Sequence, residues 1–465
     1  MKIKDILKAT NGKLIVGNED LICENFSKDT RTIQKGDIYI GIKGEKFDGS
    51  QFWKQALDNG AEAVIIQNIG ITADEKEKYS NKSIIEVEDT LKALYEIAKY
   101  KRSLYDIPVI AVTGSVGKTS TKDVIASVVN TKYKTLKTEG NNNNNIGLPL
   151  TILKLKEHEA MVIEMGMNHF GEISLLTDIA KPTLAVITNI GTSHIGNLGS
   201  RENILKAKLE ILEGMKTPKV IINNDNDLLH KWYEENKNKI EIHTFGIKNE
   251  SELMAQSIKL KEESSEFTAM PISLENNESV EKSSAVEIRV PVGGEHFIYN
   301  ALCATEVGHI LRISNEQIQN GIANFELTKK RMDIKKLENG AIIINDAYNA
   351  SYESMKASLE FLSKHTGTRK IAVLGDMFEL GEYSEELHRK VGKEVVKNGI
   401  DILICAGENS KYIIEEAKKN KDIEIYFMNN NEQIVEKLTQ ELRDGDIVLV
   451  KASNGMKFFE ICQKL

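Results

Sequence analysis

The segment TGSVGKTSTKD, residues 113–123, has the residue types and spacing of a phosphate-binding loop. Gly114 and Gly117 let the backbone fold back so that its N–H groups point at phosphate oxygens, and a helix that starts at the loop adds its partial positive charge. Lys118 would reach the β- and γ-phosphates, and the Thr119 hydroxyl would sit on Mg²⁺. The residues expected to bind the nucleotide are Thr113, Gly114, Ser115, Val116, Gly117, Lys118, Thr119 and Ser120.

The surroundings of this loop favour a functional interpretation over a chance GKT in a turn. The buried-type strand IPVIAV precedes it and the helical stretch STKDVIASVVN follows. The spacing is the shorter GxxGKT, with Val112 where the usual pattern has a further glycine. No NKxD motif for guanine occurs in the chain, so ATP is the expected nucleotide. A phosphate loop alone does not identify a reaction.

Three downstream residues could complete such a site, and their residue types leave each role open. Glu164 ends the strand-like AMVIE, at the edge where doubly wound sheets bind ligands, and either holds Mg²⁺ or is a solvated strand end. His194 follows the next strand in a glycine-rich loop, where structural and functional roles are equally supported. Lys208, in ILKAKLEIL, looks on spacing alone like a lysine on a helix surface.

The run EGNNNNNIGLPLT places five asparagines at positions 141–145. The chain is rich in asparagine and in lysine, so composition alone could produce the run. Amide side chains also suit a loop beside a nucleotide, because each has donors and an acceptor.

The elements that would position these residues fall into three blocks. With 465 residues the chain exceeds one ordinary domain. Residues 1–105 contain short apolar strands and end in a helix, and residues 106–325 alternate strand and helix before period-two strands at about 249–292. Residues 326–465 return to alternation, as in AIIIND, KIAVLGD and DIVLVKA. We expect an α/β protein of three domains: a central P-loop, doubly wound, mostly parallel sheet with small antiparallel strands, and a C-terminal Rossmann-like domain.

Composition argues against several classes of function. The net charge of −8 argues against a nucleic-acid or anionic-membrane surface. Apolar runs stay short of a membrane span, and the N-terminus lacks a signal-peptide core, so we expect a cytoplasmic protein with no stable membrane insertion. The four cysteines are far apart, which favours free thiols over disulfides or zinc.

Beyond these patterns, the chain resembles the Mur ligases, the ATP-dependent amide-bond-forming enzymes of peptidoglycan precursor synthesis. The resemblance covers the whole length and is carried by specific motifs: SKDTRTIQKGDIYIGIKGEKFDG, TGSVGKTSTKD, GNNNNNIGLPLT, EMGMNHFGEI, TNIGTSHIGNLGS, AKLEI, GGEHFIYNALCA, RMD, INDAYNASYESM, LGDMFELGEYSEELH and KASNGM. Within the family, DAYNA and LGDMxELG are similar to the ligases that add D-alanyl-D-alanine. The DNPR motif expected for a diamino-acid-adding ligase is absent.

The resemblance implies a role for each matching position. Lys118, His194, Lys208 and Arg331 would be catalytic, and two Mg²⁺ ions would be held by Thr119, Glu164, His194 and Lys208, the last as a CO₂-derived carbamate. Asn144, Asn300, Arg331 and Asp346 would join the phosphate loop in binding the nucleotide. Substrate would be bound by Thr30, Arg31, Lys43, Asp48, Gly49, Asn141, Asn143, Tyr348 and Asn349. Asn142 and Asn145 match variable positions.

The implied reaction joins D-Ala-D-Ala to UDP-MurNAc-tripeptide through an acyl phosphate, which serves cell-wall growth, cell shape and division. Residues 1–105 would bind the UDP-sugar substrate and residues 106–325 would bind ATP. Residues 326–465 would close on ATP and bind the dipeptide. We expect a monomer with small-molecule substrates and no nucleic-acid partner.

The chain departs from the family pattern at three places: Phe297 after His296, Ser351-Tyr352 after DAYNA, and Asn454 in the closing motif. The first two leave individual nucleotide contacts in doubt.

Two rival functions stay open. A sister ligase or a folylpolyglutamate-type synthase is one, although the first-domain segment counts against the folate enzymes. A nucleotide-binding switch is the other, although a switch should lack the Glu/His/Lys metal set.

Overall fold

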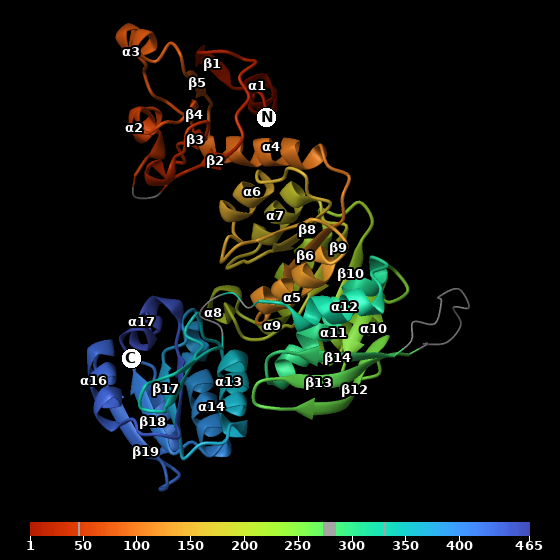
Figure 1. The fold of residues 1–465 in the computed structure, drawn as a ribbon, viewed down its shortest axis with the longest axis vertical. Coiled ribbons are helices and arrows are strands. Elements are labelled where there is room, and N and C mark those ends of the chain that lie inside the picture. The colour runs from red at the N-terminus through yellow and green to blue at the C-terminus, as the bar shows by residue number, and fades with distance from the viewer. Residues whose placement is uncertain (45–46, 273–284, 327, 329–331) are drawn as a thin grey trace.

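The computed structural model describes residues 1–465 except 45–46, 273–284, 327 and 329–331. Its strands form three sheets of five, nine and six strands, one after another along the chain. Figure 1 shows the first sheet at one end of the molecule, the nine-stranded sheet in the middle and the blue third sheet at the other end. The expected three-domain α/β fold is confirmed.

The first sheet is mixed. In spatial order its strands are β1 (Lys13–Val16), β5 (Ser83–Glu86), β4 (Ala63–Ile66), β3 (Ile38–Ile40) and β2 (Phe26–Ser27). Only the pairing of β1 with β5 is antiparallel. The helices of this part are α1 (Ile3–Thr10), α2 (Trp53–Asp58), α3 (Ala73–Lys78) and α4 (Thr90–Ser103).

Helix α4 joins the first sheet to the central one. It begins at Asp89, whose carboxylate accepts the N–H groups of Leu91 and Lys92 at 2.7 and 2.9 Å. Near its other end, Arg102 is buried and donates from Nε to the carbonyl of Ala180 at 2.8 Å. That carbonyl belongs to the last residue of α7 (Glu172–Ala180), so the side chain ties α4 to the central domain.

The central sheet is parallel over most of its width. Its strands are, in order, β14 (Val286–Val290), β13 (Ser265–Pro271), β12 (Leu253–Leu260), β11 (Glu241–Gly246), β10 (Lys219–Asn223), β9 (Leu184–Ile187), β6 (Val109–Thr113), β8 (Ala160–Glu164) and β7 (Thr135–Lys137). The pairs β12–β13 and β13–β14 are antiparallel, as their period-two patterning predicts. The other helices of this part are α5 (Lys118–Asn130), α6 (Gly147–Ile152), α8 (Ile195–Leu198), α9 (Arg201–Leu209), α10 (Asp227–Asn236), α11 (Glu295–Ile310) and α12 (Asn315–Ala323).

The third sheet is parallel apart from its edge strand. Its order is β15 (Asp333–Lys336), β16 (Ile342–Asn345), β20 (Asp446–Lys451), β17 (Arg369–Gly375), β18 (Ile402–Ala406) and β19 (Glu424–Met428), with β15 antiparallel to β16. Its helices are α13 (Tyr352–Lys364), α14 (Ser384–Lys397), α15 (Lys411–Ala417), α16 (Asn431–Glu441) and α17 (Phe459–Lys464).

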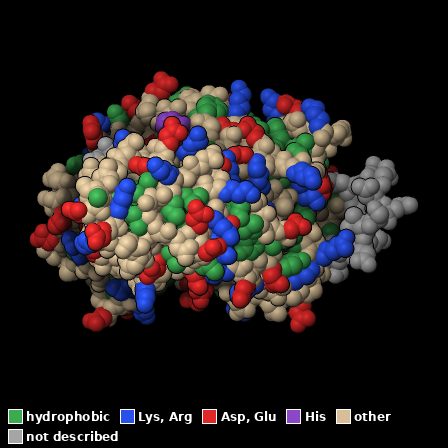
Figure 2. All heavy atoms as spheres, turned by 90° about the horizontal axis from the view of Figure 1, so that it is seen from above, with side chains coloured by type: hydrophobic (Ala, Val, Ile, Leu, Met, Phe, Trp, Pro, Cys, Tyr) green, Lys and Arg blue, Asp and Glu red, His purple; other side chains and the backbone are tan. Residues whose placement is uncertain are grey.

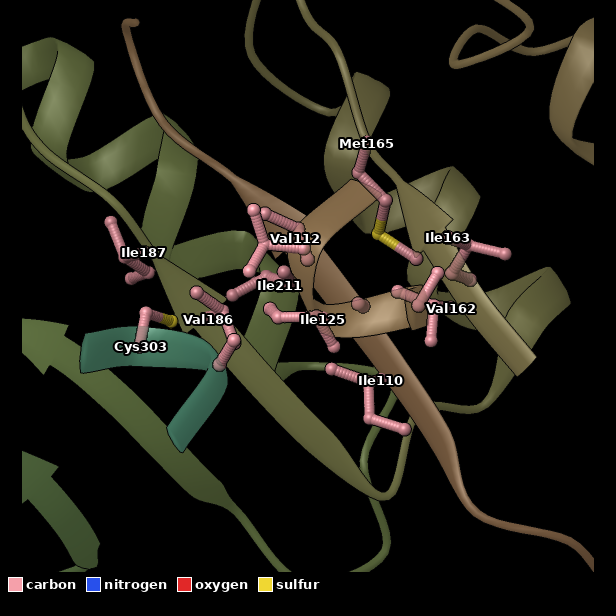
Figure 3. Packing of buried hydrophobic residues seen from close by; sticks show 14 of the residues in the cluster. Ile110, Val112, Ile125, Val162, Ile163, Met165, Val186, Ile187, Ile211 and Cys303 are labelled. Carbon is pink, nitrogen blue, oxygen red and sulfur yellow. The ribbon is translucent and has the colours of Figure 1, made fainter. Parts of the chain in front are cut away.

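The middle strands of the central sheet are buried on both faces, which explains their unbroken apolar runs. Figure 3 shows the side chains of β6, β8 and β9 close together, with Ile125 of α5 and Cys303 of α11 nearby. All four cysteines are buried and unpaired. Close packing here holds the carboxyl ends of β6, β8 and β9 in fixed positions.

The described surface has mixed charge. On the face that Figure 2 shows, acidic and basic side chains are interspersed. Among the described helices, none has both the length and the apolar character needed to cross a membrane.

Candidate active site

The phosphate loop lies between β6 and α5, as predicted. Gly114 and Gly117 have φ of +153° and +81°, and a Cβ at Gly114 would lie 1.9 Å from the Thr188 hydroxyl oxygen. Asn189 holds the loop: its side-chain oxygen accepts the Val116 N–H at 3.0 Å. The two glycines are therefore required by the loop's shape and its close approach to β9.

The Lys118 side chain folds back over the loop. Its ammonium donates to the carbonyl oxygens of Gly114 and Ser115 at 2.8 and 3.4 Å. Thr119 lies in the first turn of α5 and is buried. In the second turn, the Thr121 hydroxyl donates to the Asn300 side-chain oxygen at 2.9 Å. Asn300, on α11, is thereby placed beside the phosphate loop.

Glu164 is a buried carboxylate at the carboxyl edge of the central sheet, the edge at which the phosphate loop also lies. It ends β8, next to β6, and only 2% of it is exposed. Its Oε1 accepts from Asn143 Nδ2 at 2.7 Å, while Oε2 is buried and has no hydrogen-bond partner among the described residues. An orphaned carboxylate oxygen facing a nucleotide loop is a donor suited to Mg²⁺.

The asparagines that lie at the cavity are not the same three that the family pattern marks as site positions. Asn143, Asn144 and Asn145 line the cavity described below, and Asn141 is exposed and does not. Asn144 Oδ1 accepts two backbone N–H groups, those of residues 146 and 147 at 3.2 and 2.8 Å, at the start of α6. Asn145 donates to the Tyr95 hydroxyl of α4 at 3.1 Å.

His194 lies in the loop after β9 and lines the same cavity. Its φ is +64°, and its Nδ1 is hydrogen-bonded to the carboxylate of Glu379 from the third domain. Glu379 belongs to the sequence motif LGDMFELG, but its residue type and spacing predict no role for it. Its contact depends on how two domains meet, which residue spacing does not reveal.

Lys208 is not on the surface of α9. Its side chain is 1% exposed, and its ammonium makes no hydrogen bond or ion pair within the part of the chain that the structure describes. Burial, and secondarily the charge of Lys118, hold the pKa of Lys208 well below its usual value. A depressed pKa favours the neutral amine that reaction with CO₂ requires.

A cavity of about 810 Å³ joins the central and third domains. The central domain contributes the phosphate loop, Glu164, His194 and Asn300, and the third domain contributes Asp346, Tyr348 and Asn349. Lys118 and Ser120 line it, whereas Thr119 and Lys208 do not.

Lys451 and His296 are among the cavity residues that sequence reasoning missed. Lys451, at the end of β20, forms an ion pair with Asp346, which also accepts from the Ser358 hydroxyl at 2.7 Å. The signal for Lys451 was its place in the KASNGM motif. His296 is the other: burial lowers the pKa of His296 to about 4, so its ring is neutral.

The structure does not bring the first-domain candidates into this cavity. Arg31 donates to Asp29 from Nε and Nη2, at 2.9 and 2.7 Å. Lys43 and Asp48 are joined by a β-bridge, and Gly49 is buried where a Cβ would lie 2.5 Å from the Ile42 carbonyl. Thr30 starts a short 3₁₀ turn in the same region. The predicted Arg331 lies outside the described residues.

A second group of charged side chains lies away from the cavity. His243 Nδ1 is 3.1 Å from carboxylate oxygens of both Glu252 and Glu306, and its Nε2 is 3.1 Å from Glu241. Burial alone would lower the pKa of His243, but the hydrogen bonds to Glu252 and Glu306 outweigh it and raise the pKa to about 10. The ring is therefore a cation held by carboxylates.

Together, the fold and the cavity define a phosphate-loop enzyme whose site is shared by two domains. Three family models match the chain: the Mur ligase family catalytic domain at residues 25–102, the Mur ligase middle domain at 112–308 and the Mur ligase glutamate ligase domain at 330–454. The chain belongs to the Mur ligase family.

The similarity to relatives and to solved structures covers most or all of the chain. The UDP-N-acetylmuramoyl-tripeptide–D-alanyl-D-alanine ligase of Bacillus subtilis is 37% identical, covering 100% of this chain and 98% of that protein. The Escherichia coli protein of the same name is 32% identical over 89% of this chain and 86% of its own. A crystal structure of MurF from Acinetobacter baumannii superimposes with a TM-score of 0.86 at 28% identity, covering 100% and 98% of the two chains. MurF from Thermotoga maritima, in complex with ADP, has a TM-score of 0.80 at 28% identity and covers 96% and 98%.

Proposed function

We propose that this chain is the ATP-dependent ligase that joins D-alanyl-D-alanine to UDP-N-acetylmuramoyl-tripeptide in peptidoglycan precursor synthesis. The observation that carries the proposal is the cavity between the central and third domains. It combines a phosphate loop, a third-domain face and a buried carboxylate, one oxygen of which is unpaired within the described part of the chain. The chain also aligns end to end with a ligase of that name.

The reaction needs ATP because a carboxylate is a poor acyl donor. The tripeptide carboxylate attacks the γ-phosphorus, which forms an acyl phosphate and releases ADP. The dipeptide amine then attacks the acyl carbon, and phosphate leaves from a tetrahedral intermediate. Several anionic groups must meet in one place, so positioning and charge neutralisation dominate catalysis.

The residues at the cavity suit that task. Lys118 lines the cavity from the first turn of α5. When ATP binds, its ammonium would leave the loop carbonyl oxygens and donate to the β- and γ-phosphates instead. The loop N–H groups and the start of α5 would hold the phosphates. Asn300 would approach the base, and Asp346 and Arg331 would reach the nucleotide from the third domain. Asn143 would keep the Glu164 carboxylate in place through its 2.7 Å hydrogen bond.

The donor set fits Mg²⁺. Glu164 offers a buried oxygen that has no hydrogen-bond partner among the residues that the structure describes, and Thr119 is the hydroxyl that follows the loop lysine. His194 and Lys208 would complete a second position. When bound, Mg²⁺ supplies positive charge to the phosphate oxygens and to the substrate carboxylate.

Lys208 would contribute as a carbamate. Its neutral amine adds to CO₂, forming a C–N bond and releasing one proton, and this converts a buried amine into an anionic oxygen donor. The low pKa and the absence of an ion pair among the described residues favour this chemistry. A lysine that was structural would instead be expected to have a carboxylate partner.

In the first domain, Thr30, Arg31, Lys43, Asp48 and Gly49 would bind the UDP-sugar part of the tripeptide substrate. Tyr348 and Asn349, which line the cavity, would contact the peptide part or the incoming dipeptide. A monomeric state and a cytoplasmic location remain predictions from the sequence.

Phosphate release with defined substrates tests the proposal. Purified protein with ATP and Mg²⁺ should release phosphate only when a UDP-muramoyl-tripeptide and D-Ala-D-Ala are both present, and the product mass should equal the pentapeptide. Offering tripeptides that end in lysine and in diaminopimelate identifies the substrate. Phosphate release without either peptide would instead indicate a nucleotide switch.

A further inference from the structure

Two glycine-rich segments from different domains meet beside the cavity. One follows β9 and contains His194 and α8, and the other follows β17 and contains Glu379 and a 3₁₀ turn at Gly381–Tyr383. The Gly196 N–H donates to the Glu379 carbonyl at 3.0 Å. The Tyr383 hydroxyl donates to the Gly199 carbonyl at 2.7 Å.

The glycines of the first segment are what permit this contact. A Cβ at Gly196 would lie 2.5 Å from the Gly381 nitrogen and 2.7 Å from the Glu379 carbonyl oxygen. These are backbone atoms that cannot move aside without separating the domains. A Cβ at Gly191 would lie 2.6 Å from the Glu353 carboxyl carbon. Glycine at positions 191 and 196 therefore leaves room for the third domain at two points of the segment that follows β9.

At the centre of the contact, the Glu379 carboxylate is hydrogen-bonded to His194 Nδ1. Both residues have positive φ, +64° for His194 and +62° for Glu379, a conformation that side-chain-bearing residues rarely adopt. Strained backbone on both partners is typical of functional sites. Within the described residues, His194 Nε2 has no hydrogen-bond partner, so it is the nitrogen available to a ligand.

We propose that Glu379 is a positioning residue. Its carboxylate accepts the Nδ1 proton of His194, fixes the ring and leaves the Nε2 lone pair to bind a divalent cation, but only while the third domain is docked. A carboxylate that orients a metal-binding histidine raises the histidine's basicity and its affinity for metal. The inference rests on the proposed function, and it adds that docking of the third domain prepares the metal site of the central domain.

The first test reads the tautomer of His194 without metal or substrate. Full-length protein with ¹⁵N-labelled histidine is examined by long-range ¹H–¹⁵N correlation at pH 8, and a His194→Gln variant identifies the signals among the nine histidines. We expect the proton on Nδ1 in the wild type and loss of that preference in Glu379→Gln. The control is Glu382→Gln, an exposed glutamate on the same segment that faces no partner among the described residues, and it should match the wild type.

The second test measures Mn²⁺ affinity of the full chain by electron paramagnetic resonance of the free ion. Glu379→Gln should weaken Mn²⁺ binding about 10-fold or more, Glu379→Asp should restore part of the affinity, and Glu382→Gln should change nothing. Gly196→Ala should weaken Mn²⁺ binding as well, because it displaces the third domain while keeping both His194 and Glu379. The Gly196→Ala measurement still tests the role of Glu379 if the Glu379→Gln variant folds poorly.

The outcomes separate this inference from the proposed function. A wild-type Nε2–H tautomer, or unchanged Mn²⁺ affinity in both Glu379→Gln and Gly196→Ala, would overturn the role of Glu379 even in an active ligase. Altered tautomer and metal affinity in a chain that fails to ligate the two peptides would support the role of Glu379 and overturn the function alone.

Discussion

Lys208→Ala is the substitution whose effects on activity and on stability should diverge most. The lysine is buried without a hydrogen-bonding partner among the described residues, so removing it deletes no native hydrogen bond. If its carbamate holds Mg²⁺ against the transferred phosphoryl group, kcat should fall at least about 10³-fold, which is about 4 kcal/mol of transition-state stabilisation.

The expected change in stability is small because two contributions oppose each other. Losing three buried methylenes costs about 2.4 kcal/mol at about 0.8 kcal/mol each. Removing a buried amine that lacks a partner returns about 1–3 kcal/mol. The free energy of unfolding should therefore change by less than about 2 kcal/mol. If Lys208 were purely structural, the substitution would have the reverse effect. Stability would fall strongly, and activity would fall only as far as folded protein is lost.

The assay is peptide-dependent phosphate release, with urea denaturation measured on the same preparations. Lys206→Ala is the matched control, an exposed lysine two residues earlier on α9. High bicarbonate should fail to rescue Lys208→Ala, whereas a short carboxylic acid should partly restore its activity, and wild-type protein in ¹³C-bicarbonate should give a carbamate signal by NMR. Full activity of Lys208→Ala would refute the carbamate role.

Three further outcomes are expected. Lys118→Ala should lower kcat about 10²–10⁴-fold in the same assay, and a mild loss would contradict the phosphate-loop assignment. Asn144→Ala should reduce kcat/KM because its side chain accepts two backbone N–H groups at the cavity, whereas Asn142→Ala should not; equal kinetics would count against dividing the asparagine run. Because the pKa of His243 is raised to about 10, its stabilisation is complete below its ordinary pKa of 6.5 and is lost as pH rises through 10. The difference in unfolding free energy between wild type and His243→Gln, about 2 kcal/mol at pH 6, should shrink toward pH 10, and urea titrations showing a constant difference would contradict this.

Local signals predicted the fold because the buried strands are encoded in short apolar runs. The buried β6, β8 and β9 read as unbroken apolar segments, and the alternating β14 reads as a half-buried strand. The phosphate loop was also predictable, since its glycines, lysine and following helix are consecutive in the chain. Glu164 followed from its place at a strand end.

Features made by tertiary packing were not predictable in this way. Lys208 sits in a polar helix sequence, yet tertiary packing buries its side chain. The pair of His194 and Glu379 joins residues 185 apart, and that of Asp346 and Lys451 joins residues 105 apart. Only the arrangement of two domains brings such residues together, and the resemblance to a family named one member of each pair.

The hydrogen bond from Arg102 to the Ala180 carbonyl also bears on how the chain is made. The acceptor is synthesised 78 residues after the donor, which at 5–20 residues per second is a wait of about 4–16 s on the ribosome. During that interval the guanidinium at the end of α4 has no central domain to bind. Once residue 180 has emerged, the first domain can be tied to the growing central sheet, well before the third domain is translated. Vectorial synthesis would thus assemble the first two domains into one body before the part that carries Glu379 exists.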